Sequence, residues 1–240
     1  MHRAVLIFFI VILIPTAIAL EQRNLIVFWN VGQGSWTTLI TSKACVHVDV
    51  GGRWRPLVKL CQSRKNLLWF THYDWDHISL ARKIFMTAPD TCLMQTVPPQ
   101  IKAFKRKFLG IVPLCKETLP RVKVIYQSNF IENNDSSAFI LAKRVLITGD
   151  ATQKMEKKWL HKIPWKNVHV LLAGHHGSRT SLSPQLLKKL SHLRMVIVSA
   201  EKKKYGHPHK ETVEKLLRAR VPMIKTEDFG SVAFELWNSS

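Results

Sequence analysis

The sequence has few cysteines and lacks the close cysteine spacings of a thiolate zinc site. Its four cysteines are Cys45, Cys61, Cys92 and Cys115, and no two of them form a Cys-x-x-Cys pair. We therefore expect no zinc cluster built from thiolates. In an oxidising compartment these residues would form one or two disulfides, with three possible complete connectivities. The alternative is that they are simply small buried apolar residues.

Long apolar runs are scarce as well. Apart from the N-terminal segment, no stretch approaches the roughly 20 apolar residues that a membrane-spanning helix needs, so we expect no transmembrane domain in the mature chain. Internal repeats, linkers and low-complexity stretches are not apparent in the 240 residues, which we interpret as one domain. The sequence contains no nucleotide-binding motif, and no nucleotide cofactor is expected. It gives no indication of protein partners.

Acidic residues are outnumbered. The chain has 16 Asp and Glu against 36 Lys and Arg, a formal net charge of +20. This excess attracts polyanions, nucleic acid first and then anionic membrane surfaces or wall polymers, unless it only solvates the surface. Two basic clusters are candidate contacts for a DNA backbone: Lys102, Lys105, Arg106 and Lys107, and Lys202, Lys203 and Lys204.

The N-terminus has the pattern of a secretory signal. His2 and Arg3 precede an apolar run over residues 4–14, Pro15 ends that run, and the small-x-small pattern of residues 17–19 marks a cleavage site. We predict a signal peptide over residues 1–19 and a hydrolase domain over residues 20–240, exported to the periplasm or secreted. Without cleavage, the segment would anchor the domain to the membrane.

The rest of the chain alternates short apolar strands with helical segments. A hairpin is expected around residues 32–34, and Ser183 and Pro184 have the positions of a helix cap and a first helical residue. The order of strands and helices predicts an α+β or α/β fold, specifically an αββα sandwich of two mixed sheets with flanking helices. Strands are expected over 24–32, 36–41, 44–52, 66–72, 122–127, 137–143, 144–150, 168–176, 195–200 and 231–237, and helices over 78–86, 152–163, 183–193 and 209–220.

Three polar clusters directly follow apolar strands: "THYDWDH", "TGD" and "AGHHGS". Strand ends that meet at one edge of a sandwich would bring these side chains together. A histidine after a strand is usually structural, and Gly-Asp is usually a turn, but four metal-capable side chains in six residues would repel one another without a cation. Nitrogen and oxygen ligands without sulfur suit one or two zinc or manganese ions. Paired ions share a hydroxide nucleophile and clamp the oxygens of a phosphoryl displacement. The candidate ligands are His72, Asp74, Asp76, His77, Asp150, His175 and His176.

Six motifs in order give the chain a family resemblance. It resembles the metallo-β-lactamase superfamily, and more closely the metallo-β-lactamase-like domain of the ComEC/Rec2 competence proteins, which act in DNA uptake. The motifs are "NVGQGSWTTLI", "VDVGG", "FTHYDWDHISL", "ENNDSSAFIL" with "RVLITGDA", "LLAGHHGSRTS" and "VIVSAEKKKYGHPH".

The resemblance implies a metal-dependent hydrolase of a phosphodiester, with DNA as the expected substrate. It implies that His72 and Asp74 bind a first metal and that Asp76 and His77 bind a second. Asp76 would also orient the hydroxide. Asp150 would bridge the two ions.

The resemblance assigns the remaining polar residues less directly. His175 is the first choice to complete the second site. His207 is the competing ligand, or a general acid for the leaving oxygen. His176 would support the ligands, and Ser178 would hydrogen-bond a phosphate oxygen.

The chain departs from the family pattern at several positions. Asn30 and Ser35 replace two aspartates of the opening motif, and Asn133 or Asn134 stands where the superfamily has a third histidine motif. One tight and one loose ion is therefore an open alternative. The chain has no channel, so it would cut or bind DNA and not transport it.

Two other functions compete with a nuclease. The same metal chemistry would serve a hydrolase of small esters, amides or β-lactams, and a vestigial site would leave a catalytically weak DNA-binding module. Three aromatic residues, Trp54, Tyr73 and Trp75, are candidates for stacking on unpaired bases. Trp75 is favoured because it lies inside the metal motif, and the other two are expected in the core.

Overall fold

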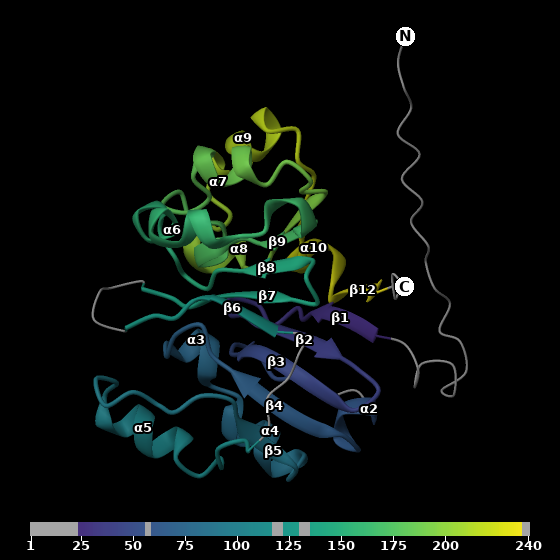
Figure 1. The fold of residues 1–240 in the computed structure, drawn as a ribbon, viewed down its shortest axis with the longest axis vertical. Coiled ribbons are helices and arrows are strands. Elements are labelled where there is room, and N and C mark those ends of the chain that lie inside the picture. Colours follow the sequence, from purple (N-terminus) through teal and green to yellow (C-terminus); the bar gives the residue numbers. More distant parts are fainter. Residues whose placement is uncertain (1–23, 56–58, 117–121, 130–134, 237–240) are drawn as a thin grey trace.

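Two six-stranded sheets face each other, with helices on the outer face of each (Figure 1). The computed structural model describes residues 24–55, 59–116, 122–129 and 135–236. The predicted signal peptide over 1–19, Asn133 and Asn134 lie outside these described residues.

The first sheet has the strand order β12-β1-β2-β3-β4-β5. Neighbours from β12 through β3 run antiparallel, whereas β3, β4 and β5 are parallel to one another. Its strands are β1 (Asn24–Phe28), β2 (Trp36–Ile40), β3 (Ala44–Val50), β4 (Lys65–Trp69), β5 (Thr91–Leu93) and β12 (Val232–Leu236).

The second sheet has the order β11-β10-β9-β8-β7-β6. Strands β8 to β11 are parallel, and β6 and β7 complete the sheet in antiparallel pairing. Its strands are β6 (Val122–Tyr126), β7 (Ala138–Leu141), β8 (Val145–Ile147), β9 (Val170–Leu172), β10 (Met195–Val198) and β11 (Met223–Lys225).

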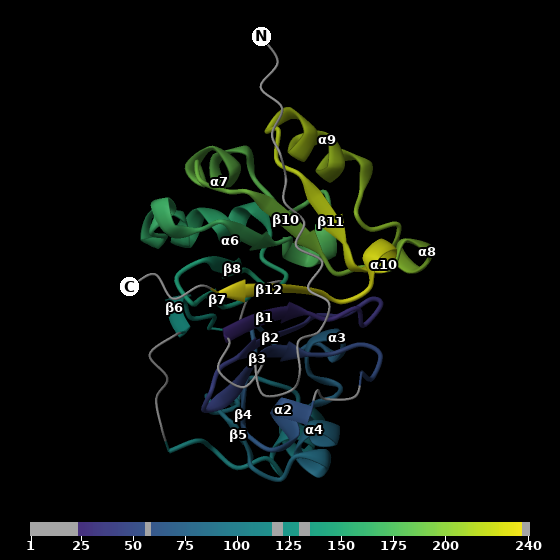
Figure 2. The same cartoon turned by 90° about the vertical axis from the view of Figure 1, so that its right-hand side faces the viewer.

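The helices form the two outer layers (Figures 1 and 2). The first sheet is flanked by α2 (Lys59–Gln62), α3 (Trp75–Ile78), α4 (Ala81–Thr87) and α5 (Ala103–Leu109). The second is flanked by α6 (Gln153–Trp159), α7 (Pro184–Lys189) and α9 (Lys210–Arg218), while α8 (Lys202–Tyr205) and α10 (Thr226–Phe229) follow β10 and β11. Short 3₁₀ turns cover Leu160–Lys162, Trp165–Asn167 and Gly174–Gly177. Within the described residues, no helix combines the length and apolar character needed to cross a membrane.

The sheets pack through an apolar layer in which every member is almost wholly buried. Phe28 and Val48 come from the first sheet, and Phe139, Ile147 and Ile197 come from the second. Because each sheet is covered by helices on one face and by the other sheet on the other, the sequences of the strands are nearly continuous apolar runs. Burial of this kind stabilises the fold by roughly 25 cal/mol per Å² of apolar surface.

The predicted αββα sandwich of two mixed sheets is confirmed. The cap at Ser183 is also present, since its side chain accepts the backbone N–H of Leu186 and Pro184 is the first helical residue. The expected helix over 78–86 corresponds to α4, and only its first residue belongs to the separate short helix α3, which was not predicted. Strands β5 and β11 and helices α2, α5, α8 and α10 were not predicted, because segments of three to seven residues carry too little periodicity.

All four cysteines are paired in the structure. Cys45 of β3 is bonded to Cys61 of α2, and Cys92 of β5 is bonded to Cys115. Of the alternatives that the sequence left open, the structure has two disulfides with these partners. Each ties a strand of the first sheet to a neighbouring segment.

A buried histidine connects strands β2, β3 and β4. The Nδ1 atom of His47 accepts from Trp36 Nε1 at 3.1 Å and from Thr38 Oγ1 at 2.8 Å. Its Nε2 lies 2.9 Å from Asn66 Oδ1, and the amide of Asn66 donates to the carbonyl oxygens of Cys61 and Arg64. Since the indole N–H only donates, His47 is the neutral tautomer with its proton on Nε2.

The stability of the protein is expected to fall in acid because of His47. Burial lowers its pKa to about 4 from 6.5, although the hydrogen bond to Asn66 acts in the opposite direction. Between these values the unfolded chain takes up a proton that the folded chain does not. Stability present above pH 6.5 is therefore lost as the pH falls towards 4, by about 3 kcal/mol for this residue.

The free energy of unfolding from urea titrations at pH 4 to 7 measures this effect. The control is His47→Gln, which keeps one donor and one acceptor but does not titrate. The difference between the wild type and this variant should shrink as the pH falls. A constant difference across that range would contradict the assignment.

Candidate metal centre

Polar loops that follow three strands meet at one edge of the sandwich. The loop after β4 carries His72, Asp74, Asp76 and His77, the turn after β8 carries Asp150, and the 3₁₀ turn after β9 carries the histidine pair. The carboxyl ends of β4, β8 and β9 thus supply the cluster, as the sequence pattern predicted.

The first group of ligand atoms joins His72, His77 and Asp150. One ligand atom from each lies within 4.8 Å of the other two. The Oδ2 of Asp150 is 3.7 Å from His72 Nε2, and its Oδ1 is 3.2 Å from His77 Nε2. All three residues are buried.

The second group joins Asp76, His77 and His176 under the same distance limit. His176 Nε2 lies 3.3 Å from Asp76 Oδ2 and 3.7 Å from Asp150 Oδ1. His77 therefore belongs to both groups, and Asp150 contacts members of both. The arrangement thus offers ligand sets for one ion or for two.

Several ligand atoms are buried and have no hydrogen-bond partner among the described residues. They include Nε2 of His72, His77 and His176 and Oδ1 of Asp150. A buried polar atom without a partner costs about 1 to 3 kcal/mol, so four that converge on one space call for a ligand. Imidazole nitrogens and carboxylate oxygens fit a divalent ion such as zinc or manganese.

Hydrogen bonds behind the cluster fix the orientation of the histidine rings. His77 Nδ1 donates to Asp49 Oδ2 at 2.8 Å, and His176 Nδ1 donates to the carbonyl oxygen of Ser199 at 2.8 Å. Asp49 also accepts the backbone N–H and the hydroxyl of Thr71. Such contacts select the tautomer whose Nε2 is free for a metal.

Asp49 was not among the residues singled out from the sequence. It is fully buried at the end of β3, and its φ of 56° is unusual for a residue other than glycine. The signal that would have found it is the motif "VDVGG", where it is the single charged residue in a buried strand.

The carboxylates and histidines shift one another's ionisation. Burial alone would lower the pKa of His77, but Asp49 and Asp150 outweigh it and raise this pKa well above its ordinary value. Burial would raise the pKa of Asp150, but His77, His176 and His72 hold it well below its usual range. Burial and the nearby His77 lower the pKa of His72 to about 4. Asp150 is thus an anion within a ring of imidazoles.

Backbone conformation also shapes the site. His175 and His176 have φ values of 47° and 55°, a left-handed conformation that costs non-glycine residues of order 1 kcal/mol or more each. Position 51 requires glycine because the backbone of Asp76 packs directly against it, and a Cβ there would lie 2.0 Å from the carbonyl oxygen of Asp76. This contact lets α3 dock against the end of β3, where Asp76 O accepts from Ser35 N at 2.9 Å.

Two predicted ligands lie outside both groups. The side chain of Asp74 is 62% exposed, and its Oδ1 accepts from Lys105 Nζ at 3.0 Å while its Oδ2 is 3.7 Å from His72 Nε2. The side chain of His175 is 29% exposed, and its Nε2 is 3.8 Å from Asp150 Oδ2. The geometry thus brings His176 into the second group, in the position for which the family resemblance had His175 as first choice and His207 as the competitor.

Other predicted residues lie around this cluster. The His207 ring is 6.0 Å from that of His175 and 6.4 Å from that of His176. Burial, then His209 and these two histidines, lower the pKa of His207 to about 4. The Ser178 hydroxyl is hydrogen-bonded to Thr180. It therefore stabilises the loop.

The two departures from the family pattern differ in their positions. The Ser35 hydroxyl is buried and has no hydrogen-bond partner among the described residues. Ser35 lines a cavity of about 10 Å³ together with His77, Asp150 and His176. The Oδ1 of Asn30 instead accepts from the backbone N–H of Gly32 at 3.4 Å.

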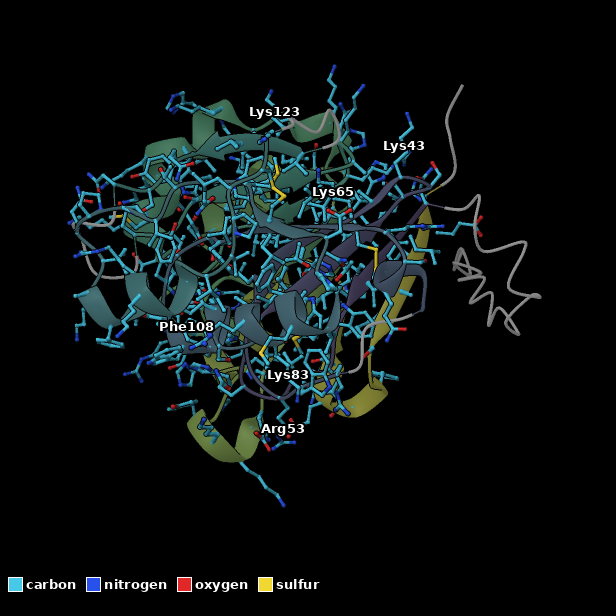
Figure 3. The ribbon with its side chains drawn as sticks, turned by 90° about the horizontal axis from the view of Figure 1, so that it is seen from below. Lys43, Arg53, Lys65, Lys83, Phe108 and Lys123 are labelled. Atoms are coloured by element: carbon cyan, nitrogen blue, oxygen red, sulfur yellow. A yellow bond between two sulfur atoms is a disulfide. The ribbon has the colours of Figure 1, made fainter. Side chains whose placement is uncertain are left out.

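The two basic clusters approach the site from different helices. Lys102, Arg106 and Lys107 are exposed on or next to α5, where Lys105 pairs with Asp74. Lys202, Lys203 and Lys204 are exposed on α8. Basic side chains also lie elsewhere, since Figure 3 shows Lys43, Lys65 and Lys123 on the opposite side from Arg53. Charge alone therefore does not mark the site.

Comparison with solved structures identifies the fold. The metallo-β-lactamase fold protein YhfI from Bacillus subtilis superposes with a TM-score of 0.59 at 11% identity, covering 89% of this chain and 100% of that one. A diphosphatase from the PhnP family has a TM-score of 0.52 at 12% identity, with 85% of each chain covered. The chain has the metallo-β-lactamase fold.

Sequence comparison supports the resemblance to competence proteins. Recombination protein 2 of Haemophilus influenzae is 25% identical over 222 residues, which are 85% of this chain, and ComE operon protein 3 of Bacillus subtilis is 26% identical over 93 residues, which are 39% of it. The chain covers 28% and 12% of the length of these two proteins. No protein-family model matches it.

Proposed function

We propose that the protein is a metal-dependent hydrolase that cleaves phosphodiester bonds in DNA. The observation that carries the proposal is that three buried Nε2 atoms without a hydrogen-bond partner among the described residues converge on the carboxylate of Asp150, those of His72, His77 and His176. A divalent ion held there would supply Lewis-acid and nucleophile-activating chemistry. The proposed ligands are His72, His77, Asp150, Asp76 and His176, with Asp74 and His175 at the edge of the cluster.

The chain's own residues define several roles. Asp150 contacts imidazoles of both groups and sets their spacing. Asp76 is partly exposed at the mouth of the site, and the nearby imidazoles of His176 and His77 hold its pKa at about 2 against the effect of burial. It is therefore an anionic acceptor positioned to orient a water molecule towards a substrate. The low pKa of His207 suits an acceptor or a ligand better than a proton donor at neutral pH.

Charge and relatives support DNA as the substrate. The net charge of +20 favours a polyanion. Lys105 of α5 pairs with Asp74, and Lys204 of α8 lines a pocket together with Asp76. The name of Recombination protein 2 also points to DNA, and the diphosphatase with the same fold is named for cleaving a phosphate linkage.

We also propose that the domain works outside the cytoplasm. The two disulfides persist best in an oxidising compartment. The apolar N-terminal run with its small-x-small pattern has the composition of an export signal.

The test is cleavage of labelled single- and double-stranded DNA by the chelator-stripped protein after zinc, manganese or magnesium is added back. We expect cutting that depends on the added ion and weakens steeply as salt rises, because binding releases counterions. Cleavage of a chromogenic β-lactam or ester in place of DNA would overturn the proposal in favour of a small-molecule hydrolase. Salt-sensitive binding without cutting by any ion would overturn it in favour of a binding module.

A further inference from the structure

A pocket of about 530 Å³ opens beside the candidate metal centre. Asp76 lines it and also belongs to the second ligand group. The pocket lies between α3 and α8, which Figure 2 shows on the same side of the molecule. A group bound in it would be a direct neighbour of any group bound at Asp76.

Two exposed aromatic rings line this pocket. Trp75 of α3 is 43% exposed and Tyr205 of α8 is 56% exposed. Neither belongs to an apolar core cluster within the described part of the chain. By contrast, Tyr73 is 2% exposed and the half-buried Trp54 packs on Trp36. Trp75 is stacked with Phe104 at 6.0 Å and meets Phe108 edge-on at 5.0 Å between ring centroids. Its ring is therefore held in place before a ligand arrives.

Polar and cationic groups complete the lining. Lys204 and Arg53 contribute positive charge, and the carboxylate of Glu201 pairs with Arg53. The backbone N–H of Glu201 donates to Gln33 Oε1 at 3.2 Å. Figure 3 shows Arg53 beside α8. This lining matches the three parts of a nucleotide. The rings offer a π-face to the base, the cations attract the phosphate oxygens, and the fixed polar groups can hydrogen-bond the sugar.

We propose that this pocket binds an unpaired nucleotide of single-stranded nucleic acid, with its base on Trp75 and Tyr205 and its phosphate directed to Lys204 and Arg53. The proposal rests on the proposed phosphodiesterase function, for which it names the substrate class. A base within a duplex is stacked and paired, so its face is not available to the rings. The site therefore selects single strands over duplexes.

The test measures binding and does not depend on turnover. A short labelled oligothymidylate is titrated with the full chain in chelator, and its fluorescence anisotropy is followed. We expect Trp75→Ala and Tyr205→Ala each to weaken binding by roughly tenfold, the effect of losing one base–aromatic stack. Trp75→Phe and Tyr205→Phe should retain binding. Phe229→Ala removes a ring that is 71% exposed outside the pocket and is the matched control.

A labelled duplex and the metal-supplemented cleavage assay separate the two proposals. Duplex binding should be the same for the wild type and the alanine variants. If the alanine variants bind the single strand as the wild type does, or weaken both forms equally, the pocket proposal is overturned even where the wild type cuts DNA. If the alanine variants lose single-strand binding as predicted but no ion supports DNA cleavage, the pocket proposal is supported and the nuclease proposal is overturned.

Discussion

Asp150→Asn is expected to lower the hydrolysis rate by about 10³-fold or more. The two carboxylate oxygens of Asp150 lie 3.2 to 3.8 Å from the Nε2 atoms of four histidines. The amide has one acceptor and no charge, so it cannot serve both ligand groups or balance a cation. A loss of about 4 kcal/mol of transition-state stabilisation corresponds to this rate.

Metal binding provides a second measurement for the same variant. Saturating zinc or manganese should raise the melting temperature of the wild type by about 5 to 10 °C, because a ligand at 100 times its Kd contributes about 2.7 kcal/mol. Asp150→Asn should lose most of that increase. Asp90→Asn, a change at an exposed residue, is the matched control. A variant at position 150 that kept its rate within tenfold of the wild type would exclude Asp150 from the reacting centre.

His176→Ala is expected to weaken binding of one ion about 100-fold, and His175→Ala considerably less. The His176 ring is buried and oriented by Ser199, so its Nε2 faces Asp76 and Asp150. The His175 ring is partly exposed, and its Nε2 lies 3.8 Å from Asp150. Because both residues share the left-handed backbone conformation, each variant carries the same backbone cost, and the comparison isolates the ligand.

Isothermal titration of the metal-free variants with zinc and with manganese gives the affinity and stoichiometry. We expect His176→Ala to lose the weaker binding step and His175→Ala to keep it. The reverse order would restore His175 as the residue that completes the second site.

The relative metal affinities of His176→Ala and His175→Ala also indicate how many ions the protein holds. Two ligand groups share His77, and Asp150 contacts both, so loss of one group need not empty the other. One retained step in His176→Ala would indicate a tight ion in the group of His72, His77 and Asp150.

The sequence by itself determined the layers and the edge at which the site forms. Apolar runs that end in "THYDWDH", "TGD" and "AGHHGS" specify strands whose polar ends come together once the sheets pack. These patterns are local, because strand formation and the residues just beyond a strand are set within a few positions. The αββα order and the polar cluster at one edge were predictable for this reason.

Tertiary structure decided which side chains face one another across that edge. The orientation of His176 depends on a carbonyl oxygen 23 residues away, that of His77 on Asp49 at 28 residues, and the direction of Asp74 on Lys105 at 31 residues. The disulfide partners and the pocket between Trp75 and Tyr205 likewise join distant segments. Hydrogen bonds and ring contacts of this kind form only when the sheets bring their loops together, and sequence spacing does not encode them.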